Sequence, residues 1–284
     1  MPDIGRLIKR LNAKVIYARI KTGHQFQPRW ADYPRWVPVH VEYDGPYEYP
    51  DWDTDDLLEE VNRRLRIDHK QPAPGFTLGF RMAEGLPAYL WACPDCFEPA
   101  SLDPSGADRN SVSCRACGAT WTLDTSNRMK RPGHEVLWVC DALDRIVDHY
   151  GVPPILSAGR YESAGVVLEV EGAGVGRVER GKQPVQLAAG RLVLDAAALS
   201  VHRGAEVVWS CGLDEIRVLN VELGNVLQLR TKAGLLQLDT GEHSTLMWEH
   251  FVEAWRLLAL ERAAEARKVR VAAERAALSS ESQP

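Results

Sequence analysis

The sequence predicts an α+β protein with several domains, and three observations carry this prediction. Two cysteine pairs with metal-ligand spacing lie between residues 93 and 117, about seven short strand-like segments follow residue 165, and amphipathic helical segments flank both regions. The chain has 284 residues, of which 45% are hydrophobic, so it can form two or three domains with a buried core. The net charge of −5 shows no strong bias toward nucleic acid or acidic membranes.

The first 75 residues are predicted to form an α/β domain. A helix end at 5–11 precedes a strand at 14–20, and residues 37–43 alternate as a second strand. A helix then starts at Thr54, the expected N-cap, and ends near Leu65. Its apolar stripe consists of Leu57, Leu58, Val61 and Leu65.

The most specific motif is a set of four cysteines, namely Cys93, Cys96, Cys114 and Cys117. Two Cys-x-x-Cys pairs separated by 17 residues have the ligand spacing of a zinc ribbon, which we expect at 85–125. Four thiolates complete the tetrahedral coordination of zinc, so this zinc is expected to be structural. Gly118 suits a turn with positive φ. Two disulfides or a redox motif are the alternatives, but residues 1–10 carry no signal-peptide character that would direct the chain to an oxidising compartment.

The other two cysteines, Cys140 and Cys211, have apolar neighbours and are expected to be reduced core residues. A connecting helix is predicted within 130–152, starting near Val136 and stopped by the prolines after Gly151. No apolar run is long enough to span a membrane. We therefore expect a cytoplasmic protein, with peripheral contact at the inner membrane face left open.

Residues 160–262 are predicted to form a small antiparallel β-barrel capped by one helix, the pleckstrin-homology-like arrangement. The strand segments are 166–170, 191–194, 199–202, 207–210, 216–223, 226–230 and 235–238. Gly224-Asn225 is a tight hairpin signal, and Ser244 is the expected N-cap of the capping helix. Trp209, Trp248 and Trp255 are expected in the core rather than in a ligand pocket. Residues 263–284 are expected to be a frayed helix followed by a disordered tail.

One stretch of the chain, residues 7–66, carries a family resemblance. Its motifs are Leu7-Ile8-Lys9-Arg10-Leu11, Val15-Ile16-Tyr17-Ala18-Arg19-Ile20, Pro28-Arg29-Trp30-Ala31, Arg35, Val39-His40-Val41 and the Asp-rich helix at 54–65. These resemble the C-terminal half of the 1-acyl-glycerol-3-phosphate (lysophospholipid) acyltransferase family, some bacterial members of which are similar in carrying a zinc ribbon and a β-rich C-terminal domain. The resemblance implies a role in phospholipid biosynthesis and a lipid or acyl-carrier partner. It makes Arg29, Trp30 and Arg35 candidates for lining an acyl or phosphate site.

The family's catalytic signatures are absent from this chain. In His-x4-Asp the histidine acts as general base, but none of the eight histidines here is followed by aspartate at the fifth position. Glu84-Gly85-Leu86 lacks the Thr and Arg of the Glu-Gly-Thr-Arg-like phosphate motif. We therefore expect no catalytic residue and no acyl transfer by this chain alone. A truncated homologue, a mis-called start codon or a gene fragment would explain this, and a partner polypeptide could supply the N-terminal half.

The alternative function is a non-catalytic zinc-ribbon and pleckstrin-homology-like module that binds lipid or protein. Nucleic acid is not an expected partner, because residues 97–113 hold one basic side chain, Arg109, against three acidic ones. The acidic run 42–60, with nine carboxylates, is expected to be a solvated face rather than a cation site. The apolar face of the strand at 15–20 needs covering, which predicts a partner, self-association or low solubility.

Overall fold

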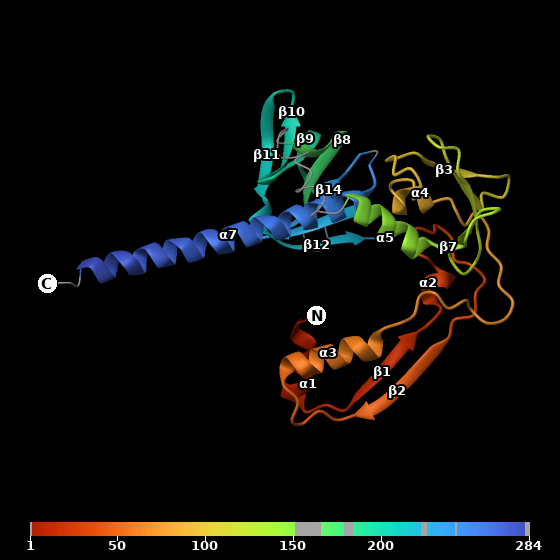
Figure 1. Cartoon of the computed structure of the whole chain (residues 1–284), viewed down its shortest axis with the longest axis horizontal. Coiled ribbons are helices and arrows are strands. Elements are labelled where there is room, and N and C mark those ends of the chain that lie inside the picture. Colours follow the sequence, from red (N-terminus) through yellow and green to blue (C-terminus); the bar gives the residue numbers. More distant parts are fainter. Residues whose placement is uncertain (1, 151–165, 179–183, 223–225, 242, 282–284) are drawn as a thin grey trace. The chain divides into compact units, whose positions relative to one another are not determined.

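The computed structural model describes residues 2–150, 166–178, 184–222, 226–241 and 243–281 (Figure 1). Its contacts group into two compact units, Met1–Leu86 with Asp103–Asp141, and Pro87–Leu102 with Ala142–Pro284. The fold is mixed α+β with antiparallel sheets, as the sequence predicts. The finer division at 1–75, 85–125, 130–152, 160–262 and 263–284 stays a prediction.

The first unit begins with a two-stranded antiparallel sheet and two helices. β1 (Val15–Ile20) pairs with β2 (Val41–Tyr47), and Ala18 lies opposite Tyr43. α1 (Pro2–Leu11) contacts α3 (Thr54–Leu65), and α3 contacts β1. The core of this part consists of Tyr17, Tyr49, Leu57 and Val61, with Ile4 and Ile8 of α1 packed against it.

The second strand lies four residues later than the predicted segment at 37–43. Thr22 accounts for part of this shift, because its hydroxyl donates to the Pro38 carbonyl at 2.6 Å and accepts the His40 N–H at 2.8 Å. The backbone of Trp36 forms an antiparallel β-bridge with Leu78 and does not pair with β1. The backbone before residue 41 therefore has partners other than β1.

The N-cap of α3 is Asp53 and not Thr54, which is the first helical residue. Asp53 Oδ1 accepts the N–H of Asp55 at 2.9 Å and that of Asp56 at 2.8 Å. Both residues have cap-forming side chains, and the backbone selects the one whose carboxylate reaches two free N–H groups.

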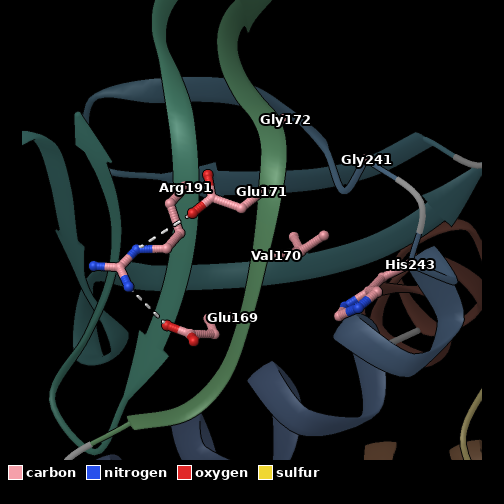
Figure 2. Close-up of a pocket in the computed structure, with 7 residues that line it drawn as sticks. All are labelled: Glu169, Val170, Glu171, Gly172, Arg191, Gly241 and His243. Carbon is pink, nitrogen blue, oxygen red and sulfur yellow. Dashed lines mark hydrogen bonds and ion pairs between the residues drawn. The ribbon is translucent and has the colours of Figure 1, made fainter. Parts of the chain in front are cut away.

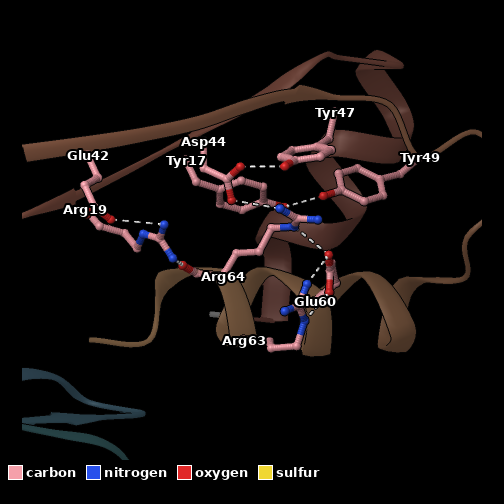
Figure 3. A network of polar contacts seen from close by, with 9 residues as sticks. All are labelled: Tyr17, Arg19, Glu42, Asp44, Tyr47, Tyr49, Glu60, Arg63 and Arg64. Carbon is pink, nitrogen blue, oxygen red and sulfur yellow. Dashed lines mark hydrogen bonds and ion pairs between the residues drawn. The ribbon is translucent and has the colours of Figure 1, made fainter. Parts of the chain in front are cut away.

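A polar network fastens α3 to the sheet (Figure 3). Arg64 donates to Asp44 at 2.8 Å and to Glu60 at 2.5 Å, and its guanidinium carbon lies 3.7 Å from the centroid of the Tyr47 ring. The Tyr17 and Tyr49 hydroxyls hydrogen-bond at 2.9 Å. Arg63 and then Arg64 lower the pKa of Glu60 to about 2, so this carboxylate is charged at neutral pH.

A second sheet contains Cys114, at the end of β4, while Cys93 and Cys96 precede its first strand. Its strands pair in the order β3-β4-β5-β6-β7 within the described residues. They are β3 (Leu102–Ser105), β4 (Ser111–Cys114), β5 (Thr120–Leu123), β6 (Arg128–Lys130) and β7 (Leu137–Trp138). The sheet thus continues past residue 125, the predicted end of the ribbon. The connecting helix α5 (Val139–Tyr150) starts three residues later than expected.

The second unit contains short α4 (Leu86–Tyr89) and a larger antiparallel sheet in the order β11-β10-β9-β8-β14-β13-β12. Its strands are β8 (Val166–Val178), β9 (Val185–Asp195), β10 (Ala198–Arg203), β11 (Glu206–Gly212), β12 (Ile216–Glu222), β13 (Val226–Thr231) and β14 (Gly234–Asp239). All seven predicted strand positions are confirmed. The predicted hairpin signal Gly224-Asn225 lies outside the described residues, and Glu222 at the end of β12 pairs with Val226 at the start of β13.

The predicted closed barrel is wrong for the described part of the chain. β11 and β12 are the two end strands and have no pairing with each other there, so the sheet is open. The short helix η1 (Leu213–Glu215) joins them, and it packs against the C-terminal helix α7 (Thr245–Glu281). Arg256 of α7 donates to the Ile216 carbonyl at 3.4 Å, which satisfies a backbone acceptor at the start of β12.

α7 has the predicted N-cap and the predicted helical extension. Ser244 caps it as predicted, since its hydroxyl accepts the Met247 N–H at 3.3 Å, and Trp248 and Trp255 are buried while Trp209 is half-buried. The expected helical extension after residue 262 is present and continues to Glu281. An Ala/Arg/Glu-rich composition favours this outcome. None of the helices in the described ranges has the length and apolar character needed to cross a membrane.

Candidate metal centre

The structure brings the four predicted cysteines together. The sulfurs of Cys93, Cys96, Cys114 and Cys117 all lie within 4.8 Å of one another. Four sulfurs on a tetrahedral zinc at about 2.3 Å lie roughly 3.8 Å apart, so only a small contraction is needed to bind the ion. Among the described residues, this is the group of three or more His, Cys, Asp or Glu side chains with metal-binding spacing.

The first pair lies on a tight turn after α4. The Cys93 N–H donates to the Glu98 carbonyl at 3.1 Å, and the Cys93 carbonyl accepts the Phe97 N–H at 2.9 Å. The Asp95 N–H donates to Cys93 Sγ at 3.4 Å. Cys93 is buried and Cys96 is exposed.

The second pair repeats this geometry at the end of β4. The Cys114 N–H donates to the Ala119 carbonyl at 2.8 Å, and the Cys114 carbonyl accepts the Gly118 N–H at 3.0 Å. Cys114 is buried and Cys117 is exposed. Each turn thus supplies one buried and one exposed sulfur from equivalent positions, and together they provide the four ligands of a tetrahedral ion.

The two turns differ at the residue after the second cysteine. Gly118 has φ of 73°, as the sequence predicts. Its counterpart is Phe97 with φ of 60°, which sequence reasoning missed because a bulky residue rarely adopts this conformation. The Phe97 ring stacks on His149 of α5, with centroids 3.9 Å apart, and its carbonyl accepts a hydrogen bond from the Tyr150 hydroxyl. The only sequence signal was the equivalence of its position to that of Gly118.

The donor set fits a closed structural site. Four thiolates fill tetrahedral coordination and leave no position for a substrate or a reactive water. The four sulfurs converge within 4.8 Å of one another, which fits one shared metal ion. Cys211 is buried and Cys140 half-buried, and burial raises the pKa of the Cys211 thiol to about 11. A metal can be held here, and its identity as zinc rests on the ligand type.

The three residues suggested by the family resemblance have different environments. Arg29 is exposed, whereas the Trp30 indole donates to the Met82 carbonyl at 3.1 Å. Arg35 is 3% exposed, and its guanidinium carbon lies 5.7 Å from the centroid of the Trp30 ring. Arg35 Nη1 donates to Asn127 Oδ1 at 2.6 Å and to the Thr125 carbonyl at 3.3 Å. Arg35 therefore ties the N-terminal segment to the turn between β5 and β6, and the substrate-binding role stays a prediction.

The second unit has a cleft of about 580 Å³ (Figure 2). Arg191 pairs with Glu169 at 3.2 Å and with Glu171 at 4.0 Å, and Figure 2 shows these side chains on one side of β8. Val170 and His243 lie on the other side of that strand. In a small-molecule site a few polar groups converge on one point, and in this cleft they do not.

Comparisons with known proteins identify no family for this chain. No family model matches it, and no curated protein matches it. One similar solved structure is the C-terminal domain of an unknown protein from Leishmania infantum, at 16% sequence identity and a TM-score of 0.23. That likeness covers 37% of this chain and 98% of the other.

Proposed function

We propose that this chain is a zinc-folded binding module that performs no catalysis of its own. The observation that carries the proposal is the four-cysteine cluster, whose ligands leave no open coordination position. In sites of this kind the free energy of metal binding becomes free energy of folding, on the order of 10 kcal/mol. The two turns are short and their inner cysteines are buried, so the ion would hold together a region with a small core of its own.

Metal analysis of the purified chain tests the zinc assignment. We expect one zinc per chain, lost in Cys93→Ser and in Cys117→Ser and retained in Cys140→Ser, the matched control outside the cluster. Chelation should increase hydrogen exchange across residues 89–123 because the fold there depends on the ion. One zinc per chain in both cluster variants would contradict the four-thiolate assignment.

A relation to lysophospholipid acyltransferases is the second candidate. One observation favours it: β1, the Pro28–Ala31 segment, β2 and the acidic start of α3 follow one another in the order that the resemblance implies. On this proposal the chain belongs to a protein of phospholipid biosynthesis, and the open sheet with α7 is a docking part. The catalytic step would lie outside this chain, because it has no His-x4-Asp.

An acyl-transfer assay separates these roles. Purified, zinc-loaded chain should transfer no acyl group to lysophosphatidate beyond a heat-treated control. Measurable transfer would show that a catalytic group exists here and would end the proposal of a non-catalytic module.

A further inference from the structure

Two segments of the first unit, around residue 36 and from 76 to 80, lie side by side and present an apolar face. Trp36 and Leu78 exchange two backbone hydrogen bonds, at 2.8 and 3.0 Å, so their side chains share one face. Exposure alternates along the second segment, with Thr77 and Gly79 partly buried between exposed neighbours. The exposed fractions are 75% for Trp36, 73% for Phe76, 40% for Leu78 and 70% for Phe80. We call these four residues the aromatic face.

The opposite side of the same backbone is fastened to the β5–β6 turn. Arg35 binds Asn127 at 2.6 Å, and the Thr77 hydroxyl binds that of Thr125 at 2.6 Å. Val37 is 5% exposed. The exposed side chains therefore project from a backbone held on its inner side, and binding through them costs little backbone ordering.

The size of the aromatic face argues against a second copy of the chain as its partner. An aromatic side chain has a surface of about 200 Å² and a leucine somewhat less, so the four exposed fractions correspond to roughly 500 Å² of exposed apolar surface. This is as large as the largest apolar patch of a typical monomer, which often marks a binding site. It is smaller than the roughly 800 Å² that each partner buries in a stable protein interface. A lipid bilayer needs no such matched area, because it takes up protruding side chains individually.

The charges near this face suit a phospholipid surface. The chain as a whole is acidic, but its run of nine carboxylates lies at 42–60. Segments 28–40 and 69–81 hold four basic side chains and one acidic one. Lys70 pairs with Asp141 and Arg81 pairs with Glu84, while Arg35 is buried. The surroundings are thus close to neutral, and headgroup phosphates would meet little repulsion there.

We propose that the aromatic face docks on the surface of a phospholipid bilayer. Trp36, Phe76 and Phe80 would enter the boundary between headgroups and acyl chains, where aromatic side chains are favoured. This inference goes beyond the zinc-folded module and needs neither the metal's identity nor the acyltransferase resemblance.

Vesicle co-sedimentation with the full zinc-loaded chain tests the proposal. The probes are vesicles of phosphatidylcholine with and without phosphatidylglycerol. We expect binding to both, with at most a modest gain from the anionic lipid. The double variant Trp36→Ser/Phe80→Ser should lower the partition coefficient about tenfold or more. The control is Tyr43→Ser, a 76% exposed aromatic residue on β2, which should change it less than about twofold.

Three results would overturn the proposal. The first is that the unaltered chain binds neither vesicle. The second is that the double variant and Tyr43→Ser lower the partition coefficient equally. The third is that the chain forms a dimer without lipid and that the double variant dissociates this dimer. Zinc content and melting temperature report whether the variant folds. If it does not fold, hydrogen exchange of the unaltered chain decides, because docking must slow exchange at residues 76–80 when vesicles are added. Unchanged exchange there would equally refute lipid docking.

Discussion

The hydrogen bond between Arg35 and Asn127 offers a sharp test of how the first unit is held together. Asn127 is 8% exposed and makes two side-chain contacts. Its Oδ1 accepts from the Arg35 guanidinium at 2.6 Å, and its Nδ2 donates to the His24 carbonyl at 3.0 Å. The perturbation is Asn127→Ala, which removes both contacts and leaves the Arg35 cation in place.

The magnitude follows from these contacts. A hydrogen bond to a charged group contributes about 1.5–3 kcal/mol and a neutral one about 0.5–1.5 kcal/mol. Arg35 Nε and Nη2 have no hydrogen-bond partner among the described residues, so after the substitution the Thr125 carbonyl, at 3.3 Å, is the one hydrogen-bond acceptor that this buried cation keeps within that part of the chain. We expect Asn127→Ala to lower the free energy of unfolding of this unit by roughly 2–4 kcal/mol.

Arg35→Met should cost less, about 1 kcal/mol, because it removes the buried charge together with its bond. In the Arg35→Met background, Asn127→Ala should then cost only about 1 kcal/mol, the value of the neutral contact. The exposed Asn62→Ala on α3 is the matched control and should change stability by less than about 0.5 kcal/mol.

Hydrogen exchange is the suitable assay, since the chain has two compact units and need not unfold in one step. Peptides from residues 24–37 and 120–130 report the opening free energy on either side of the contact. The reasoning would be refuted if Asn127→Ala lowered the opening free energy equally, within about 0.3 kcal/mol, in the unaltered chain and in Arg35→Met. Residues in contact are expected to have coupled effects on stability.

Two further predictions concern the N-terminal part of the chain. The pKa of Glu60 is about 2 in the folded state, against an ordinary value of 4.5, chiefly because Arg63 and Arg64 hydrogen-bond to it. Its stabilising contribution is therefore present above pH 4.5 and lost as the pH falls toward 2, so Glu60→Gln should flatten acid unfolding over this window, whereas the exposed Glu59→Gln should not. Gly85→Ala should strongly destabilise the first unit, because its Cβ would lie 1.9 Å from the Trp30 carbonyl oxygen. The control is Gly174→Ala, whose Cβ would lie 3.4 Å from the Ala188 carbonyl oxygen, an ordinary contact. Thermal melting compares the two variants, and an equal fall in melting temperature would contradict the close approach at Gly85.

The sequence predicted features that depend on local spacing. The prediction of a four-cysteine cluster was correct because two residues between the ligands of a pair place both sulfurs on one turn. The prediction of positive φ at Gly118 was correct because glycine adopts this conformation readily. The seven strands of the second unit followed from alternation over a few residues. The cap at Ser244 followed from side-chain chemistry next to an apolar stripe.

Other features depend on partners far away in the chain, and only the tertiary structure decided them. β2 starts late because Thr22 and Leu78 engage the preceding backbone, and Phe97 keeps its positive φ against the α5 side chains that stack on it and bond to its carbonyl. The sheet stays open where α7 packs beside its end strand. Arg35 is buried and bonded to Asn127, 92 residues away in the chain, while the neighbouring Trp36 is exposed. Local composition fixes which backbone shapes are accessible, whereas burial and hydrogen bonding between distant segments select among them.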